Sequence, residues 1–475
     1  MASRGHLLLA LLVLAATAAA ASGGRHQARV SKPARPRLEL VPAAPDASLA
    51  DRARDDVHRH AYIRSQLASR RGRRAAEVGA SAFAMPLSSG AYTGTGQYFV
   101  RFRVGTPAQP FVLVADTGSD LTWVKCRGAG AAAGTGAGSP ARVFRTSASK
   151  SWAPIACSSD TCTSYVPFSL ANCSSPASPC AYDYRYKDGS AARGVVGTDS
   201  ATIALSSGSG RGGGDSSGRR AKLQGVVLGC TATYDGQSFQ SSDGVLSLGY
   251  SNISFASRAA ARFGGRFSYC LVDHLAPRNA TSYLTFGPGP EDPAASSSFA
   301  PAPAAQTPLL LDRRMSPFYA VTVDAVCVAG EALDIPADVW DVDRNGGAIL
   351  DSGTSLTILA TPAYRAVVAA LSKHLAGLPR VTMDPFEYCY NWTTADGASA
   401  PEIPKLEVRF AGSARLEPPA KSYVIDAAPG VKCIGVQEGS WPGVSVIGNI
   451  LQQEHLWEFD LRDRWLRFKH TRCAL

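Results

Sequence analysis

The fold of this chain is decided by two short stretches, Val114-Ala115-Asp116-Thr117-Gly118-Ser119 and Ile349-Leu350-Asp351-Ser352-Gly353-Thr354. Each is an apolar run that meets Asp, a hydroxyl residue, Gly and a second hydroxyl residue. Such a pattern indicates a buried strand that ends in a tight turn, in which Gly gives the backbone room and the carboxylate stands at the strand end. The aspartates are 235 residues apart, a separation that favours equivalent positions in two lobes of one duplicated architecture.

Two such turns facing each other would place two carboxylates side by side. Carboxylates a few ångströms apart cannot both ionise readily, so they share a proton, and one is a base while the other is an acid. The ionised group can take a proton from a water held between the pair, while the protonated group hydrogen-bonds the carbonyl oxygen of the bond under attack. The pattern therefore indicates peptide hydrolysis without a covalent intermediate.

With these turns the chain resembles the pepsin-type aspartic proteases. The resemblance implies a mainly β fold with a few short helices, in which two β-barrel-like lobes flank a substrate cleft. Short segments rich in Gly, Thr, Val and Tyr, broken by frequent turn signals, favour the same all-β class, and 475 residues exceed the usual size of one domain. The resemblance also implies that Asp116 and Asp351 are the catalytic pair and that the hydroxyls of Ser119 and Thr354 orient them.

Three further positions follow from the same resemblance. The stretch 182–190 alternates aromatic residues and ends in Asp-Gly, which matches the flap hairpin and makes Tyr186 the flap tyrosine. Trp123 matches the tryptophan whose indole N–H bonds that tyrosine. The sequence departs from the family at Lys187 on the flap and at Ser247 below the first turn, where Gly is usual; the corresponding C-terminal element keeps Gly448.

Within the family, the chain is more similar to the plant nepenthesin-like branch. Four more stretches carry this likeness, and with the two turns they extend from residue 95 to residue 354: Thr95 to Val100, Val104 to Pro107, Arg266 to Leu271 and Gly346 to Leu350.

Eleven cysteines behind an export signal indicate a disulfide framework with one thiol left over. Four of them cluster before the proposed flap, as in the cysteine-rich insert of nepenthesin-like enzymes. A zinc site there is the weaker alternative, because no His lies among them. The resemblance implies the pairs Cys157–Cys180, Cys162–Cys173, Cys126–Cys230, Cys270–Cys473 and Cys389–Cys433, which leaves Cys327 free.

The N-terminus predicts export and processing. Residues 1–22 have an Arg before an apolar run and then small residues, which is typical of a secretory signal peptide. We expect secretion to the apoplast, with the vacuole as the alternative destination, and no membrane anchor. Lobes are predicted over 86–300, including the insert and flap, and over 301–475. Four sequons predict glycosylation, at Asn172, Asn252, Asn279 and Asn391.

Residues 23–85 form a predicted basic prosegment with 13 Lys and Arg against 6 Asp and Glu. Such a segment can bind nucleic acid or an acidic membrane. The favoured interpretation is that its cations pair with an acidic cleft near neutral pH and leave as carboxylates protonate, with a helix-rich inhibitory piece over Asp51 to Arg74. The mature form is then expected to be a monomer that binds extended peptide or protein substrates, with no nucleic acid and no cofactor.

Other chemistries fit the sequence less well. Gly214-Asp215-Ser216-Ser217-Gly218 has the form of a serine-hydrolase turn but lies in a Gly/Ser loop. The close pair His58 and His60 lies among arginines that would repel a metal ion. The main alternative is a catalytically silent pepsin-like protein that binds a peptide or inhibits a glycosidase. Retention of both aspartates with their turns favours the enzyme, whereas Ser247 and Lys187 keep the alternative open.

Overall fold

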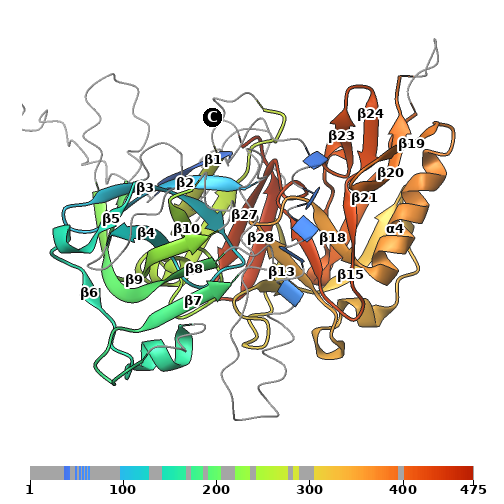
Figure 1. Ribbon diagram of the computed structural model, residues 1–475. Helices are drawn as coiled ribbons and strands as arrows, with labels where there is room; N and C mark the ends of the chain where they lie inside the picture. Colours follow the sequence, from blue (N-terminus) through green and yellow to red (C-terminus); the bar gives the residue numbers. More distant parts are fainter. Residues whose placement is uncertain are drawn as a thin grey trace, which may run out of the picture. The chain divides into compact units, whose positions relative to one another are not determined.

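A computed structural model of the protein describes residues 37–42, 49–50, 53–54, 56–57, 59–60, 63–64, 97–127, 142–166, 173–185, 191–204, 220–235, 242–276, 282–287, 304–393 and 401–473. Strands dominate these residues, as predicted, and Figure 1 labels most of the elements. The largest sheet combines fifteen of the described strands. They are β1 (Arg37–Pro42), β2 (Tyr98–Val104), β3 (Gln109–Asp116), β4 (Trp123–Arg127), β5 (Phe144–Arg145), β6 (Ala153–Pro154), β7 (Ala181–Arg185), β8 (Ala191–Ala204), β9 (Arg220–Asp235), β10 (Gly244–Ser247), β11 (Arg266–Cys270), β12 (Ser282–Phe286), β13 (Ala305–Pro308), β27 (His455–Asp460) and β28 (Trp465–His470).

The C-terminal half contributes three smaller sheets among the described residues. One contains β14 (Tyr319–Val321), β17 (Ala348–Asp351), β18 (Thr357–Ala360), β25 (Val436–Gly439) and β26 (Ser445–Gly448). A second contains β15 (Val323–Val328), β16 (Glu331–Ala332), β21 (Leu406–Phe410) and β22 (Ala414–Leu416). The third contains β19 (Arg380–Met383), β20 (Phe386–Asn391), β23 (Val424–Ala428) and β24 (Val431–Ile434).

One arrangement of three strands occurs in both halves of the chain. In the first half, β10 lies between β3 and β4, parallel to β3, with Ser247 opposite Asp116. In the second half, β26 lies between β17 and β18, parallel to β17, with Gly448 opposite Asp351. The residues of β10, β17, β18 and β26 are all buried, because these strands are covered on both faces. The duplication predicted from the two turns is therefore present in the strand pairing.

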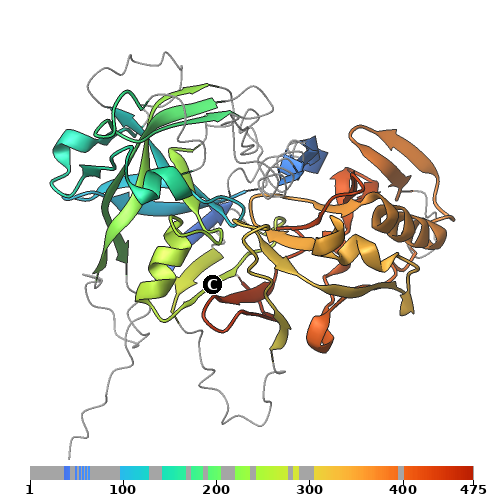
Figure 2. The ribbon, with the colours of Figure 1, turned by 90° about the horizontal axis from the view of Figure 1, so that it is seen from below.

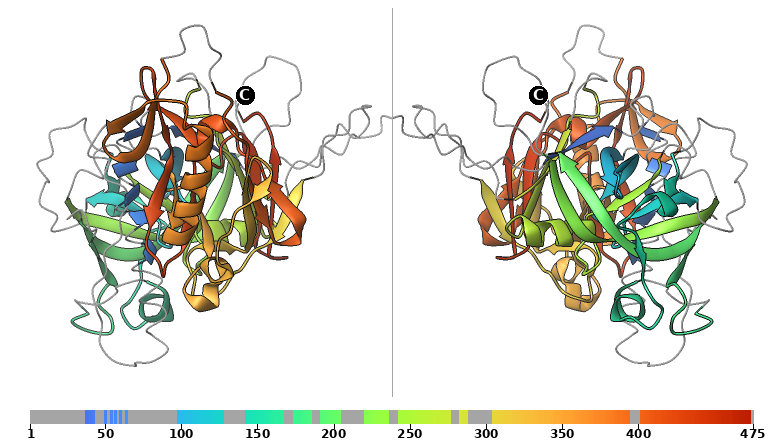
Figure 3. Two further views of the ribbon diagram at one scale, coloured as in Figure 1. Left: turned by 90° about the vertical axis from the view of Figure 1, so that its right-hand side faces the viewer. Right: turned by 90° about the vertical axis from the view of Figure 1, so that its left-hand side faces the viewer.

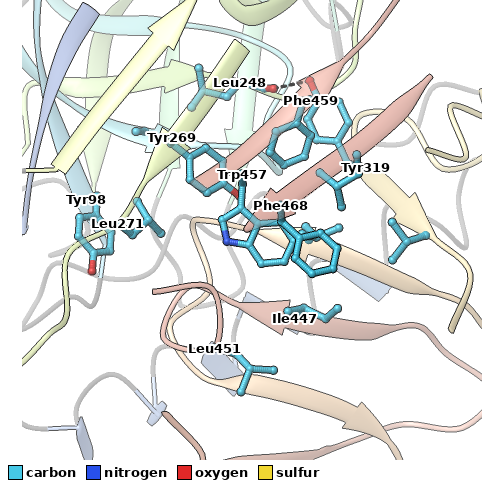
Figure 4. Packing of buried hydrophobic residues seen from close by; sticks show 14 of the residues in the cluster. Tyr98, Leu248, Tyr269, Leu271, Tyr319, Ile447, Leu451, Trp457, Phe459 and Phe468 are labelled. Carbon is cyan, nitrogen blue, oxygen red and sulfur yellow. Dashed lines mark hydrogen bonds between the residues drawn. The ribbon is translucent and has the colours of Figure 1, made fainter. Parts of the chain in front are cut away.

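The sheet strands β11, β27 and β28 carry the aromatic centre of the core. The ring of Phe267 stacks on Phe459 with centroids 4.7 Å apart, and Trp457 stacks on Phe468 at the same distance. Figure 4 shows Trp457, Phe459 and Phe468 near Tyr319, whose hydroxyl donates to the carbonyl of Leu248 at 2.7 Å. That bond joins β14, the neighbour of β17, to the residue that follows β10.

Two α-helices have defined first and last residues in the part of the chain that the structure describes. The first, α3 (Phe255–Arg262), begins at Ser254, whose side chain accepts the N–H of Ser257. The second, α4 (Thr361–His374), is the orange helix in the left view of Figure 3. It has Pro362 in its first turn and buries Tyr364, Val367, Val368 and Leu371. From the sequence alone, Pro362 at a helix start and the spacing of these four apolar residues predict a helix over Thr361 to Leu375 with one apolar face, and the structure confirms it. The remaining helical pieces are short: Thr146–Ala148, Thr161–Tyr165, Ala337–Trp340, Val342–Arg344, Ala411–Ser413 and Ala420–Ser422.

Two pieces of the predicted prosegment are described. β1 lies inside the large sheet, antiparallel to β12 on one side and to β2 on the other. Every described residue from 49 to 64 is helical, and we call these residues the N-terminal helical segment. Its buried members are Leu49, Ala53, Asp56, Arg59, His60 and Ile63, a spacing that places them on one face of a helix.

Candidate active site

The two Asp-hydroxyl-Gly turns end their strands in the same way. Asp116 is the last residue of β3 and Asp351 is the last residue of β17, and both are fully buried. The N–H of Gly118 donates to Asp116 Oδ1 at 2.9 Å, and the N–H of Gly353 donates to Asp351 Oδ1 at 2.9 Å. Each turn therefore holds one oxygen of its own carboxylate with a backbone donor.

The glycines allow the two turns to approach each other. A Cβ atom on Gly353 would lie 2.6 Å from Asp116 Oδ1, and a Cβ atom on Gly118 would lie 3.1 Å from Asp351 Oδ1. The first distance is too short for any side chain, so a residue larger than Gly at position 353 would push the carboxylate away. Each carboxylate thus faces the glycine of the opposite turn.

Two hydroxyls that sequence reasoning left without a role cross-link the turns. The N–H of Thr117 donates to Ser352 Oγ at 3.1 Å, and the N–H of Ser352 donates to Thr117 Oγ1 at 2.9 Å. Each hydroxyl also donates across, Thr117 to the carbonyl of Leu350 and Ser352 to the carbonyl of Ala115. The sequence contains a signal for these cross-links, because both copies of the pattern carry a hydroxyl residue directly after Asp. This reciprocal pair fixes the distance between the two aspartates.

The second hydroxyl of each turn makes a different bond in each half. Thr354 Oγ1 donates to Asp351 Oδ2 at 2.8 Å and so contacts the carboxylate directly. Ser119 Oγ donates to the backbone carbonyl of Asp116 at 3.3 Å instead. Within the described residues, Asp351 therefore has a side-chain donor from its own turn, and this difference makes the two carboxylates inequivalent.

The guanidinium of Arg59 lies between the two carboxylates. Its Nη2 atom donates to Asp351 Oδ1 at 2.8 Å and also, over a short contact, to Asp116 Oδ1. Its Nε donates to Asp351 Oδ2 at 2.7 Å and its Nη1 to Asp116 Oδ2 at 3.2 Å. Only 1% of the arginine is exposed, so the two ion pairs are closed off from solvent. Figure 2 shows the blue pieces of the N-terminal helical segment that carry it.

Burial and neighbouring charge shape the titration of this group. Burial raises the pKa of Asp351 above its ordinary value, Arg59 opposes the rise, and the adjacent Asp116 adds to it. For Arg59, burial alone would lower the pKa, but the two aspartates outweigh it and the pKa lies above its ordinary value. Arg59 therefore stays charged, and acidification acts on the carboxylates.

The rest of the N-terminal helical segment contacts the C-terminal half. Asp56 accepts the N–H groups of Ser355 and Leu356, and the carbonyl of Ala53 accepts a hydrogen bond from Gln437 Nε2 at 2.6 Å. Leu49 and Ala53 belong to an apolar cluster with Leu356, Phe386, Ile425 and Ile450. Sequence reasoning placed an inhibitory helix here but did not single out Asp56 or Arg59. The helical spacing of Leu49, Ala53, His60 and Ile63 is the signal that would have found the face.

Ser247 stands where the family has glycine, below the first turn, and its hydroxyl has two hydrogen-bond partners. Ser247 Oγ lies 2.8 Å from Thr122 Oγ1 and accepts the N–H of Phe255 at 3.0 Å. That N–H belongs to the first turn of α3, where no helical carbonyl can accept it. The serine thus ties β10 to α3 and leaves β10 in register with Asp116.

Replacing Ser247 with Gly is expected to lower the free energy of unfolding by about 1–3 kcal/mol, because a buried N–H loses its acceptor. Urea unfolding measures this change, with Ser158→Gly at an exposed serine as the control. Equal stability of the two variants would contradict the structural role given to the Ser247 hydroxyl.

Two predicted positions of the flap lie outside the described residues. β7 and β8 pair as the predicted hairpin, with Arg185 opposite Ala191, but Tyr186 and Lys187 belong to the connecting segment. Trp123 is described and fully buried at the start of β4. Its proposed bond to Tyr186 remains a prediction.

The cysteine pairing corrects one expectation. The structure joins Cys126 to Cys230, Cys270 to Cys473 and Cys389 to Cys433, as the resemblance implied, and Cys327 is a buried thiol. In the insert, however, Cys157 pairs with Cys173 and Cys162 with Cys180, so the expected pairs Cys157–Cys180 and Cys162–Cys173 are wrong. The reason is local. Cys162 lies in the short helix Thr161–Tyr165 and pairs with Cys180, the residue before β7, whereas the buried Cys157 precedes that helix and pairs with the exposed Cys173. Three of these sulfurs lie within 4.8 Å of one another, but each is already bonded in a disulfide.

Comparison with known proteins identifies the class of protein. The family models described as xylanase inhibitor N-terminal and xylanase inhibitor C-terminal match residues 98–288 and 318–470. The chain is 32% identical to aspartyl protease family protein 2 of Arabidopsis thaliana over 445 residues, which cover 90% of this chain and 82% of the relative. It is 28% identical to aspartic proteinase nepenthesin-2 of Nepenthes gracilis, over 81% of this chain and 79% of the relative.

Solved structures show the same fold at lower identity. The structure of edgp matches with a TM-score of 0.62 and 20% identity, over 80% of this chain and 93% of that one. Conglutin gamma, a basic 7S globulin from lupine seeds, matches with a TM-score of 0.59 and 17% identity, over 79% and 91%. Fold and sequence together place the protein in the pepsin-type aspartic protease class. The chain belongs to the plant nepenthesin-like branch of that family.

Proposed function

We propose that this protein is a secreted aspartic endopeptidase that works at acidic pH and is made as a zymogen. The observation that carries the proposal is that Asp116 and Asp351 both contact one nitrogen atom, Nη2 of Arg59. Two carboxylates that reach one nitrogen can also reach one water molecule, which is the geometry that the hydrolysis requires. Binding a partner needs no pair of buried carboxylates facing each other, and such a pair is costly to keep.

The reaction uses the pair with one proton on it. The ionised aspartate takes a proton from the water, whose oxygen bonds to the peptide carbonyl carbon, while the protonated aspartate gives its proton to the carbonyl oxygen. The resulting diol then loses the amine. One aspartate donates a proton to the departing nitrogen as the carbon–nitrogen bond breaks, and the other takes a proton from a diol oxygen. The pair returns to its single proton, and a carboxylic acid and an amine are released.

Arg59 supports the zymogen part of the proposal. Its guanidinium fills the place where the water would lie and opposes the rise that burial causes in the pKa of Asp351. As the pH falls, protonation of the pair removes the ion pairs, and the cation is left buried without full compensation. Acidification thus releases the helical segment and also places on the aspartate pair the single proton that the reaction needs.

His60 is expected to make release of the segment steeper in pH. Its Nε2 lies 3.1 Å from the carbonyl oxygen of Val444, and its ring lies close to Gly439. Burial lowers the pKa of His60, helped by the charge of Arg64 and opposed by the Val444 carbonyl. A histidine whose pKa is lower in the bound form favours binding above its ordinary pKa of about 6.5 and favours release as the pH falls below it.

The measurement compares His60→Gln with the native full chain. Binding of a statine-type transition-state mimic, followed from neutral to acidic pH, reports an open active site. The active site of His60→Gln should open at a lower pH than that of the native chain. At about pH 5, the equilibrium constant for release of the segment should be smaller by at most about 30-fold. The control is His374→Gln, at an exposed histidine of α4. Identical pH curves for both variants would show that His60 has no part in release.

Secretion and glycosylation complete the proposal. The predicted signal peptide, Asn172 and Asn279 lie outside the described residues, whereas Asn252 is exposed and Asn391 lies at the end of β20. The Asn391 side-chain oxygen accepts the N–H and the hydroxyl of Thr393, which holds the two sequon residues together. The five disulfides favour an oxidising compartment. None of the helices that the structure describes has the length and apolar character of a membrane span.

The test is cleavage of a denatured protein by the acid-treated full chain at about pH 3 to 5, where the pair holds one proton. We expect cleavage that a statine-type mimic abolishes and that declines toward neutral pH. Activity that rises steadily above neutral pH would reject the shared-proton mechanism. A folded protein freed of its prosegment that cuts nothing would instead favour the alternative, a pepsin-like binding protein or glycosidase inhibitor.

A further inference from the structure

Four exposed cations gather around the turn that follows β2. They are Arg103, Arg145, Lys150 and Lys222, and we call them the basic patch. Thr106 lies in this turn, and two of the four contact it directly. The Nζ of Lys222 donates to Thr106 Oγ1 at 2.6 Å, and the backbone N–H of Lys150 donates to the Thr106 carbonyl at 2.8 Å. The turn thus brings together cations that are far apart in the sequence.

The strand pairing places the other cations beside them. Arg103 lies opposite Thr202 of β8, and Thr202 lies opposite Lys222 of β9. Residues opposite each other point to the same face of a sheet, so the two cations share the exposed face, with Cα atoms about 10 Å apart. Arg145 of β5 is tied in by Gln109, whose side chain bonds both its N–H and its carbonyl. Gln109 begins β3, the neighbour of β2.

The charge of the basic patch is not neutralised by ion pairing. Among the residues that the structure describes, none of the four cations pairs with a carboxylate. Other exposed arginines of the N-terminal half do have such partners: Arg142 pairs with Asp243, and Arg193 pairs with Asp183. The basic patch therefore offers four cations to a ligand without first breaking an ion pair.

One carboxylate lies close to the turn, but it is buried. The hydroxyl of Ser151 lies 2.6 Å from both Thr106 Oγ1 and Asp199 Oδ1. Asp199 also accepts the hydroxyl of Ser149 at 2.8 Å, and only 1% of this aspartate is exposed. Its oxygens are thus turned inward to hydroxyl groups, whereas the four cations are exposed to solvent.

The basic patch is separate from the prosegment strand and from the active site. β1 pairs with β2 at Tyr98–Val100, whereas β8 is the neighbour of β2 at Arg103. Gln109 and Asp116 are the first and last residues of β3, so the patch and the catalytic aspartate lie at opposite ends of a strand about 23 Å long. A ligand bound at the patch therefore leaves the active site open.

We propose that the basic patch binds a polyuronide, an extended polysaccharide with a carboxylate on each sugar, and so holds the enzyme on an acidic matrix while its active site stays accessible. A single small anion suits the patch poorly, because the cations are spread over the surface and each exposed ion pair contributes little on its own. A chain of repeated carboxylates adds these weak pairs together.

Two observations favour a polysaccharide over other polyanions. The five disulfides favour an oxidising compartment, where nucleic acids are not the usual polyanions, and this step rests on the proposed secretion. A protein partner would normally bury an apolar centre. In the row that carries Arg103 and Lys222, the neighbouring residues are Pro110 and Thr202, so no large apolar side chain is exposed there.

Binding of polygalacturonate to the full chain tests the proposal by titration calorimetry at about pH 6, where carboxylates are ionised and Lys and Arg are charged. The methyl ester of the same polymer is the neutral control. We expect the acidic polymer to bind, the ester not to bind, and the affinity to fall as salt is added. Equal binding of the ester would overturn the proposal, because charge would then have no part in recognition.

A pair of double variants locates the binding surface. Arg103→Gln with Lys222→Gln should weaken binding about tenfold at low salt, since each exposed ion pair is worth up to about fivefold. Lys373→Gln with Arg472→Gln removes the same charge from exposed positions of the C-terminal half and should change the affinity little. Because the prosegment is unchanged in both, its own cations cancel in the comparison. Equal weakening by the two double variants would mean that net charge alone attracts the polymer, which overturns the patch.

The remaining outcomes separate this proposal from the proposed protease. A DNA duplex that binds more tightly than polygalacturonate, and loses affinity in Arg103→Gln with Lys222→Gln, would make nucleic acid the ligand and overturn the polysaccharide. In the acid-processed protein, kcat for a peptide should be the same with and without bound polymer, and a loss of turnover would contradict the open active site. The calorimetry needs no cleavage, so polymer binding can be established even if the protein proves to cut nothing.

Discussion

Asp116→Asn and Asp351→Asn are each expected to reduce kcat for a peptide substrate by at least about 10²- to 10⁴-fold, the usual contribution of a positioned acid or base. An amide cannot take the proton of the water, and it cannot hold the proton that the pair shares. The change preserves shape, because the Asn side-chain oxygen can still accept the N–H of Gly118 or Gly353. Turnover of the acid-processed protein at its pH optimum measures the loss.

The control for the dyad variants is Asp334→Asn, at an exposed aspartate. Unfolding by urea should show all three variants folded, so that a loss of turnover reports chemistry. The two dyad variants need not behave alike toward the prosegment, because Asp351 also receives Thr354 Oγ1 and the Nε of Arg59. Retention of most of the turnover in either dyad variant would mean that the reaction does not run through this pair.

Arg59→Gln should open the active site of the unprocessed chain near neutral pH. Removing one partner of a buried ion pair typically costs about 3–5 kcal/mol, because the remaining charge is left uncompensated, and this weakens the closed state by roughly 10²- to 4 × 10³-fold. Without Arg59 the two aspartates can take up a proton, which relieves the uncompensated charge. The opening caused by Arg59→Gln should therefore be largest near neutral pH, where protonation is least favourable. Binding of a statine-type mimic at about pH 6 to 7, by titration calorimetry, measures the opening.

Arg54 offers a matched control on the same helical segment. Its guanidinium is half exposed and pairs with Asp384, whose side chain is largely in solvent, so Arg54→Gln removes the same charge from the same segment. Surface pairs of this kind contribute about 1 kcal/mol or less. If Arg54→Gln and Arg59→Gln open the chain equally, general attraction between a basic segment and an acidic surface holds it closed, and Arg59 has no special place.

The features repeated in the sequence were predictable, and those supplied by long-range contact were not. The duplicated Asp-hydroxyl-Gly pattern was enough to predict two strands ending in facing turns, because strand and turn are local properties. The helix at Thr361–His374 was predictable for the same reason. The reciprocal bonds of Thr117 and Ser352 join residues far apart in sequence, so only the resemblance of the two copies hinted at them.

Two outcomes show what local reasoning lacks. The four cysteines of the insert allow several pairings, and the short helix at Thr161–Tyr165, which brings Cys162 to Cys180, is not evident from the spacing. The basic composition of the prosegment suggested ion pairing with a cleft, but composition does not choose among 13 cations. Arg59 reaches the two aspartates because it lies on the same helical face as Ala53, Asp56 and Ile63. The remainder of the chain sets the distance between the two turns that its guanidinium bridges.

If the chain is cut, as the proposed zymogen requires, the position of β1 has a consequence for the product. Because β1 lies between β12 and β2, a break anywhere from residue 43 to residue 96 leaves this strand attached by two backbone ladders and no covalent bond. The cut product would be a two-chain complex whose smaller chain is retained after the active site has opened. If that chain does leave, two strand edges in the middle of a sheet lose their partner together, and bare edges recruit other strands. Storage life and self-association of the mature protein would then depend on how long this short strand stays in place.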